Sequence, residues 1–165
     1  MDSGSVGEWQ PLICRGDGAW IGLMPDGQIG VGVEGEARAS LQAAGYVPLW
    51  PFLENELSEC LENLYGVWDR LEGRGFAGPE TLVQETVVTA WSSGRPYWMQ
   101  LSASWVPAMV RRPGFDPNFL REIIAEMSGW DALPAGLAGE LRSASSELSA
   151  GPEQMSARQQ SRSCE

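Results

Sequence analysis

Three short apolar stretches near the start of the chain are separated by turn signals, and in the third of them Ile29, Val31 and Val33 alternate with glycine. Short apolar runs bounded by turn residues are typical of strands, so these stretches predict strands at residues 9–14, 19–24 and 28–33. The segments between them, 15–18 and 25–27, contain the glycine and aspartate that tight turns need. We therefore predict an antiparallel meander.

Apolar residues then recur every three or four positions, which predicts the first main helix at residues 52–71. Its buried stripe is expected to contain Leu53, Leu57, Cys60, Leu61, Leu64, Tyr65, Trp68 and Leu71. The carboxylates of Glu59, Glu62 and Asp69 lie on the opposite side of this helix. The pattern therefore predicts a helix with an acidic outer face.

A second main helix is predicted at residues 116–127, where the chain carries a strong start signal. Asp116 is expected to cap the helix, Pro117 to occupy its first position, and Phe115 to pack against Leu120. A shorter helix is also predicted at residues 36–44.

Two β-branched runs in the middle of the chain, 81–91 and 97–106, predict a long β-hairpin. Gly94 and Pro96 lie in the connecting loop and make a continuous helix through it unfavourable. This loop argues against a helical seam built on three tryptophans that are spaced seven residues apart, Trp91, Trp98 and Trp105.

These elements together predict an α+β fold. We expect an antiparallel sheet of about five strands, formed by the meander and the central hairpin, with the two main helices packed on one face. Residues 1–148 are expected to form a single domain. Residues 149–165 have almost no apolar content and are predicted to be a disordered tail.

Charge and composition exclude several classes of function. The chain has 11 basic residues, all arginine, against 22 acidic residues, and its formal charge is −11. The absence of histidine excludes histidine-activated nucleophiles and histidine-ligated zinc, and the absence of lysine excludes Schiff-base chemistry. The acidic charge disfavours binding to nucleic acid and favours a basic protein partner. We expect no enzymatic activity, no cofactor and no metal.

Cysteine usage and hydropathy bear on location. Cys14, Cys60 and Cys164 have neither the spacing of a zinc site nor the even number of a disulfide framework. No stretch resembles a signal peptide or a transmembrane segment. We therefore expect a cytoplasmic protein that does not bind a membrane.

Two short motifs match the letters of known signatures but not the structural context that those signatures require. Residues 30–35 read G-x-G-x-x-G, but a dinucleotide-binding loop requires a parallel βαβ unit, and this segment belongs to the predicted meander. Arg15-Gly16-Asp17 matches a cell-adhesion tripeptide, although its position indicates a turn. Neither motif supports an assignment.

Glu85 is the candidate for catalysis, because the predicted hairpin places its carboxylate on an apolar face, where burial raises a pKa. The alternative is that Glu85 pairs with an arginine such as Arg95, Arg111 or Arg112. Arg111 and Arg112 form a second candidate, for binding an anion near the start of the helix at Asp116. Arginine pairs in loops are more often solvated or paired with acidic neighbours.

Partner binding is predicted for partly exposed aromatic residues and for the acidic helix face, which could instead be an ordinary solvated surface. The expected residues are Trp98, Tyr46, Trp50, Glu59, Glu62 and Asp69. The leading hypothesis is a non-enzymatic module of the immunity-protein, antitoxin or chaperone type that docks a basic partner. The alternatives are a small-ligand binder or carboxylate-dependent enzyme using Glu85, and a viral or mobile-element accessory protein that binds a host factor.

Overall fold

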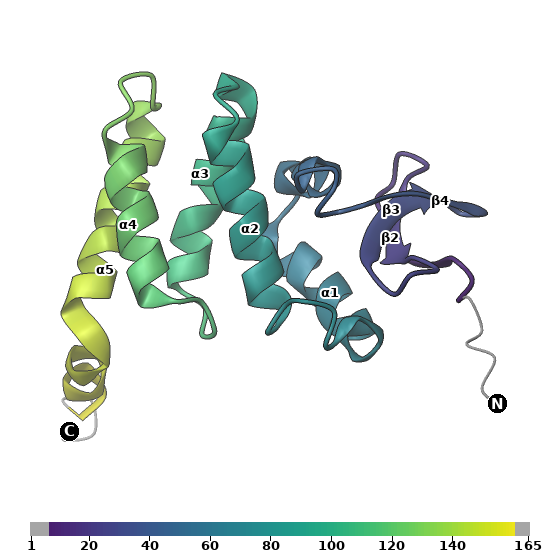
Figure 1. Ribbon diagram of the computed structural model, residues 1–165. Coiled ribbons are helices and arrows are strands. Elements are labelled where there is room, and N and C mark those ends of the chain that lie inside the picture. The colour runs from purple at the N-terminus through teal and green to yellow at the C-terminus, as the bar shows by residue number, and fades with distance from the viewer. Residues whose placement is uncertain (1–6, 161–165) are drawn as a thin grey trace. The chain divides into compact units, whose positions relative to one another are not determined.

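The computed structural model describes the backbone of residues 7–160 and the side chains of residues 7–150. In this part of the chain, six helices accompany one four-stranded antiparallel sheet (Figure 1). The prediction of a mixed fold with an antiparallel sheet is confirmed, although the sheet has four strands rather than about five. The chain divides into two compact units, Met1–Ser102 and Ala103–Glu165, and each is described separately.

The sheet of the first unit is a simple meander with the order β1-β2-β3-β4. The strands are β1 Gln10–Cys14, β2 Trp20–Leu23, β3 Ile29–Val33 and β4 Glu36–Ser40. The first three confirm the predicted strands. The fourth replaces the helix predicted at residues 36–44, because the sequence EARAS alternates polar residues with alanine and so carries the period of a strand.

Gly30 and Gly32 on β3 are required because the backbone of the adjacent strand β4 approaches them closely. A Cβ atom on Gly32 would overlap the carbonyl oxygen of Glu36, and one on Gly30 would lie 2.7 Å from the carbonyl oxygen of Ala39. The pairing of β3 with β4 also shifts register next to Gly32. The G-x-G-x-x-G segment therefore belongs to an antiparallel hairpin, which lacks the βαβ context of a dinucleotide-binding loop.

The prediction of a central hairpin is wrong, because residues 79–110 form two helices, α2 Pro79–Ser92 and α3 Pro96–Val110. Proline begins each helix, where its missing N–H costs nothing. Within α2, the hydroxyl groups of Thr86 and Thr89 each donate a hydrogen bond to the carbonyl oxygen four residues earlier, at 2.8 Å in each case. The buried residues of α2 have helical spacing, and their burial outweighs β-branched propensity: Leu82, Val83, Thr86, Val87 and Ala90.

The helices η1 and α1 complete the first unit. The 3₁₀ helix η1 spans Val47–Glu54, and α1 spans Leu57–Leu71, so the predicted helix at 52–71 begins later than expected. Four of the predicted stripe residues are buried on α1, namely Leu57, Leu61, Leu64 and Leu71. Tyr65 is 54% exposed, which contradicts its predicted place in that stripe.

The core of the first unit joins the sheet to these helices. Only a cavity of about 10 Å³ separates Ile13 and Ile21 of the sheet from the apolar side chains of η1, α1 and α2. This core is therefore closely packed. It holds one face of the sheet against the helices.

The second unit contains the end of α3 together with α4 Pro117–Ser128 and α5 Ala135–Gln160. The predicted start of α4 is confirmed: Asp116 Oδ1 accepts a hydrogen bond from the Asn118 N–H at 2.9 Å, and Phe115 is buried. Its predicted stripe is also buried, comprising Leu120, Ile123, Ile124 and Met127.

Helix α5 overlaps the segment predicted to be a disordered tail, 149–165, as far as Gln160, and residues 161–165 lie outside the described range. The assignment of residues 1–148 to a single domain with a disordered tail stays a prediction. No helix within the described residues is long and apolar enough to span a membrane.

Candidate functional site

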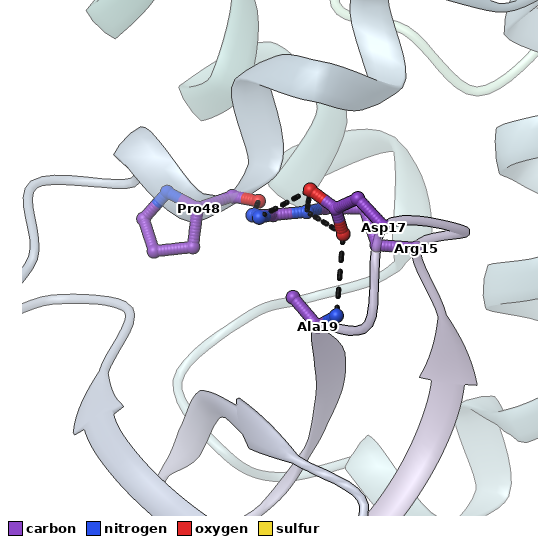
Figure 2. A network of polar contacts seen from close by, with 4 residues as sticks. All are labelled: Arg15, Asp17, Ala19 and Pro48. Atoms are coloured by element: carbon purple, nitrogen blue, oxygen red, sulfur yellow. Dashed lines mark hydrogen bonds and ion pairs between the residues drawn. The ribbon is translucent and has the colours of Figure 1, made fainter.

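The turn between β1 and β2 is fastened to η1 by Arg15 (Figure 2). Its Nη1 donates to the carbonyl oxygen of Pro48 at 2.7 Å, and its Nη2 donates to Asp17 Oδ2 at 2.8 Å. Asp17 also accepts a hydrogen bond from the Ala19 N–H at 3.2 Å. The hydrogen bond from Arg15 lowers the pKa of the Asp17 carboxyl. The Arg-Gly-Asp sequence is therefore an internal clamp, in which the charges of Arg15 and Asp17 pair with each other.

Aromatic rings adjoin this clamp where η1 meets α2 and the start of α3. Trp50 is buried and donates from Nε1 to Thr89 Oγ1 at 3.1 Å. Its ring centroid lies 5.7 Å from that of Trp98, which in turn lies 4.9 Å from that of Tyr97. The Tyr97 hydroxyl donates to the carboxylate of Glu54. These contacts fix the half-buried ring of Trp98 on a rigid support.

An open groove of about 860 Å³ runs over this part of the first unit. It is lined by Arg15, Asp17, Gly18, Ala19, Val31, Gly32, Val33, Arg38, Ala44, Val47, Pro48, Trp50, Pro51, Arg95 and Trp98. Three of the chain's 11 basic residues are therefore in one groove, and the carboxylate among its lining residues is paired with an arginine. The groove is positively charged within an acidic protein.

The outer face of α1 has the opposite charge. Glu59, Glu62, Tyr65 and Asp69 follow one another at spacings of three or four residues, which places neighbours side by side on the helix surface. All four are exposed. None of the three carboxylates forms an ion pair with a described residue. We call these four residues the acidic ridge.

Glu85 is half-buried on α2, and the strand register that placed it on an apolar sheet face is wrong. Burial, and then the negative charge of Glu85, raises the pKa of Tyr46. Tyr46 has a left-handed backbone with φ 62°, and its ring packs edge-on against Phe76 at 6.1 Å. Glu85 does not line the groove and forms no ion pair with a described arginine. The catalytic role suggested for it stays a hypothesis.

The remaining predicted residues are separated by the structure. Trp50 and Trp98 lie together at the groove, whereas Tyr46 lines a different cavity of about 250 Å³. Arg111 and Arg112 belong to the second unit and are exposed. Arg111 Nε lies 3.6 Å from a Glu147 carboxylate oxygen, so an acidic neighbour already partners it. Anion binding by this pair stays a prediction.

Sequence reasoning missed Arg38, Arg95, Tyr65 and Tyr97 as surface features. Arg38 lies on β4, which was predicted to be a helix, and Arg95 lies between α2 and α3, which were predicted to be a β-hairpin. The sequence pattern therefore could not show that the two arginines line one groove. Tyr65 was assigned to the buried stripe, although its i, i+3, i+4 spacing to Glu62 and Asp69 places it on the outer face as well.

Comparisons with known proteins give no analogy for these surfaces. Among the described residues, no group of three or more histidine, cysteine or acidic side chains could hold a metal ion. No protein-family model matches the chain, and neither the search of curated proteins nor the search of solved structures finds a similar protein.

Proposed function

We propose that the protein is a non-enzymatic binding module that docks a basic protein surface through the acidic ridge of α1. The observation that carries this proposal is an aromatic residue among carboxylates: Tyr65 is 54% exposed between Glu62 and Asp69. Protein interfaces place an aromatic anchor inside a polar rim, and Tyr65 with the carboxylates around it has this arrangement.

The two parts of the ridge have different physical roles. The carboxylates of Glu59, Glu62 and Asp69 steer a basic partner and raise its association rate, an effect that salt screens over about 10 Å at 0.1 M. The Tyr65 ring buries apolar surface once the partner is in place. Truncating an anchor of this kind costs about 1–2 kcal/mol, which corresponds to about a five- to thirtyfold loss of affinity.

The proposal fits a protein of the immunity-protein, antitoxin or secretion-chaperone type, or an accessory protein of viral or mobile-element origin that binds a host factor. The free thiols of Cys14 and Cys60 fit a reducing compartment, and we propose the cytoplasm as the location. The net charge of −11 disfavours a nucleic-acid partner.

The test is affinity capture from the native cell with two variants of equal net charge. The first is Glu59→Gln/Glu62→Gln/Asp69→Asn, which neutralises the ridge. The control neutralises three exposed carboxylates of the second unit, Glu122→Gln/Glu126→Gln/Glu140→Gln. We expect a basic protein to be captured in stoichiometric amount by the wild type and the control, and to be lost with the ridge variant and at high salt.

Equal capture by both variants would mean that the ridge is not the docking surface. Failure of the wild type to capture any stoichiometric partner at low salt would contradict the binding module itself. Tyr65→Ala adds a readout that does not depend on charge, because it should weaken capture while leaving the net charge unchanged.

A further inference from the structure

We propose that the groove of the first unit binds an extended acidic peptide segment. Two carboxylates of this peptide pair with Arg38 and Arg95, and an apolar side chain between them packs on Trp98. This site has the opposite charge to the acidic ridge and lies on different elements. It therefore goes beyond the proposed function and defines a second partner chemistry.

The charges in the groove indicate an anionic ligand. The guanidinium of Arg15 already satisfies Asp17 and the carbonyl oxygen of Pro48, so this clamp adds no net charge. Arg38 and Arg95 are exposed and form no ion pair with a described residue, although the chain carries 22 acidic residues. Two cations without an ion-pair partner among the described residues are available for carboxylates of a ligand.

The groove also contains an ordered aromatic surface next to apolar side chains. Trp98 packs against Trp50, and Trp50 is held by its hydrogen bond to Thr89 on α2. The lining also includes the apolar side chains of Val31 and Val33 on β3 and of Val47, Pro48 and Pro51 on η1. Because these rings are already ordered, a ligand loses little affinity to side-chain ordering when it binds.

The form of the groove favours a peptide over other anions. Small-molecule sites of roughly 300–1,000 Å³ enclose most of their ligand, whereas this groove of about 860 Å³ is open and would cover only one side. A polynucleotide would bring many phosphates against a protein of net charge −11, with two arginines available to neutralise them. An extended peptide needs only one covered face and can place two carboxylates at a fixed spacing.

The experiment measures fluorescence anisotropy of short labelled peptides with blocked ends, titrated with the full chain at low salt. The peptides carry two glutamates around a leucine or phenylalanine, with the glutamate separation varied from about one to three residues. We expect one separation to bind best, at least tenfold more tightly than the same peptide with glutamine in place of glutamate. A single-stranded oligonucleotide of equal charge and a small aromatic carboxylate are measured in parallel.

The variants localise the binding. Arg38→Gln and Arg95→Gln are each expected to weaken the best peptide about tenfold, and Trp98→Ala to weaken it by a similar factor. Arg70→Gln, at an exposed position of α1 outside the groove, is the matched control and should leave the affinity unchanged.

The proposal is overturned if no acidic peptide binds more tightly than its glutamine version, or if the two groove variants behave like Arg70→Gln. Tighter binding of the oligonucleotide or of the small carboxylate would also overturn it. Loss of capture by the acidic ridge has no bearing on these outcomes, so the two proposals fail independently.

Discussion

The hydrogen bond between Trp50 and Thr89 gives a sharp test of the packing beneath the groove. Trp50 is buried, and its Nε1–H donates to Thr89 Oγ1 at 3.1 Å, while the Thr89 hydroxyl donates to the carbonyl oxygen of Glu85 at 2.8 Å. The variant Thr89→Val keeps the shape of the side chain and removes the acceptor. Thr86→Val is the matched control, because the Thr86 hydroxyl only donates, to the carbonyl oxygen of Leu82.

The expected cost follows from what each variant leaves unpaired. Thr89→Val leaves the indole N–H of Trp50 without its acceptor, which costs about 1–3 kcal/mol, and the added methyl group recovers up to about 0.8 kcal/mol. With about 2 kcal/mol for the unpaired N–H, the middle of that range, the net loss of unfolding free energy is about 1–2 kcal/mol. In Thr86→Val the carbonyl of Leu82 keeps its helical N–H partner. We expect that variant to stay within about 0.5 kcal/mol of wild type or to be more stable.

The assay is equilibrium unfolding in urea followed by circular dichroism, arranged as a double-mutant cycle with Trp50→Phe. The coupling between positions 50 and 89 should be about 1–2 kcal/mol, whereas the coupling between positions 50 and 86 should be near zero. Equal losses for Thr89→Val and Thr86→Val, or an absence of coupling to Trp50, would refute this account of the packing.

Three further predictions concern the sheet, the Cys60 thiol and acid stability. Gly32→Ala should lower the unfolding free energy by about 1–3 kcal/mol in urea titrations, whereas Gly35→Ala, with no atom within 4 Å of the added methyl, should be nearly neutral. Burial raises the pKa of Cys60 to about 12, so iodoacetamide at about pH 8 should alkylate it roughly a thousandfold more slowly in the folded chain than in urea. The hydrogen bond from Arg15 lowers the pKa of Asp17 in the folded state, so its stabilisation is complete above the ordinary carboxyl pKa and is lost as pH falls through the lower folded value. Asp17→Asn should therefore flatten the loss of stability below the ordinary carboxyl pKa, by less than about 1 kcal/mol because the Asp17 side chain is 52% exposed.

The elements that sequence reasoning predicted correctly have a single strong local signal. The meander has glycine and aspartate turns, and α4 begins at an aspartate followed by proline, as the hydrogen bond to Asp116 confirms. The spacing of the leucines on α1 identified its buried stripe. In each case, local propensity and the hydrophobic pattern agree with the fold.

The central segment was mispredicted because two signals conflict there. Threonine and valine favour strands, whereas the residues that α2 buries, including Leu82 and Val87, recur with helical spacing. Burial of that face outweighs the propensity, and the threonine hydroxyls are satisfied within the helix. The groove depends on this segment, since Arg95 and Trp98 lie at the turn between two helices. It could not be predicted once that turn was assigned to a β-hairpin.

The most direct test of docking through the acidic ridge is cross-linking from within it. Photoreactive benzoylphenylalanine is introduced in place of Tyr65 or, as a control, in place of the exposed Glu122 of α4, and the native cells are irradiated. We predict one dominant cross-linked protein from position 65, with a basic surface, which is absent from position 122 and is lost when Glu62 and Asp69 are also neutralised. Indistinguishable cross-linking from the two positions would contradict the proposal that the ridge docks a partner.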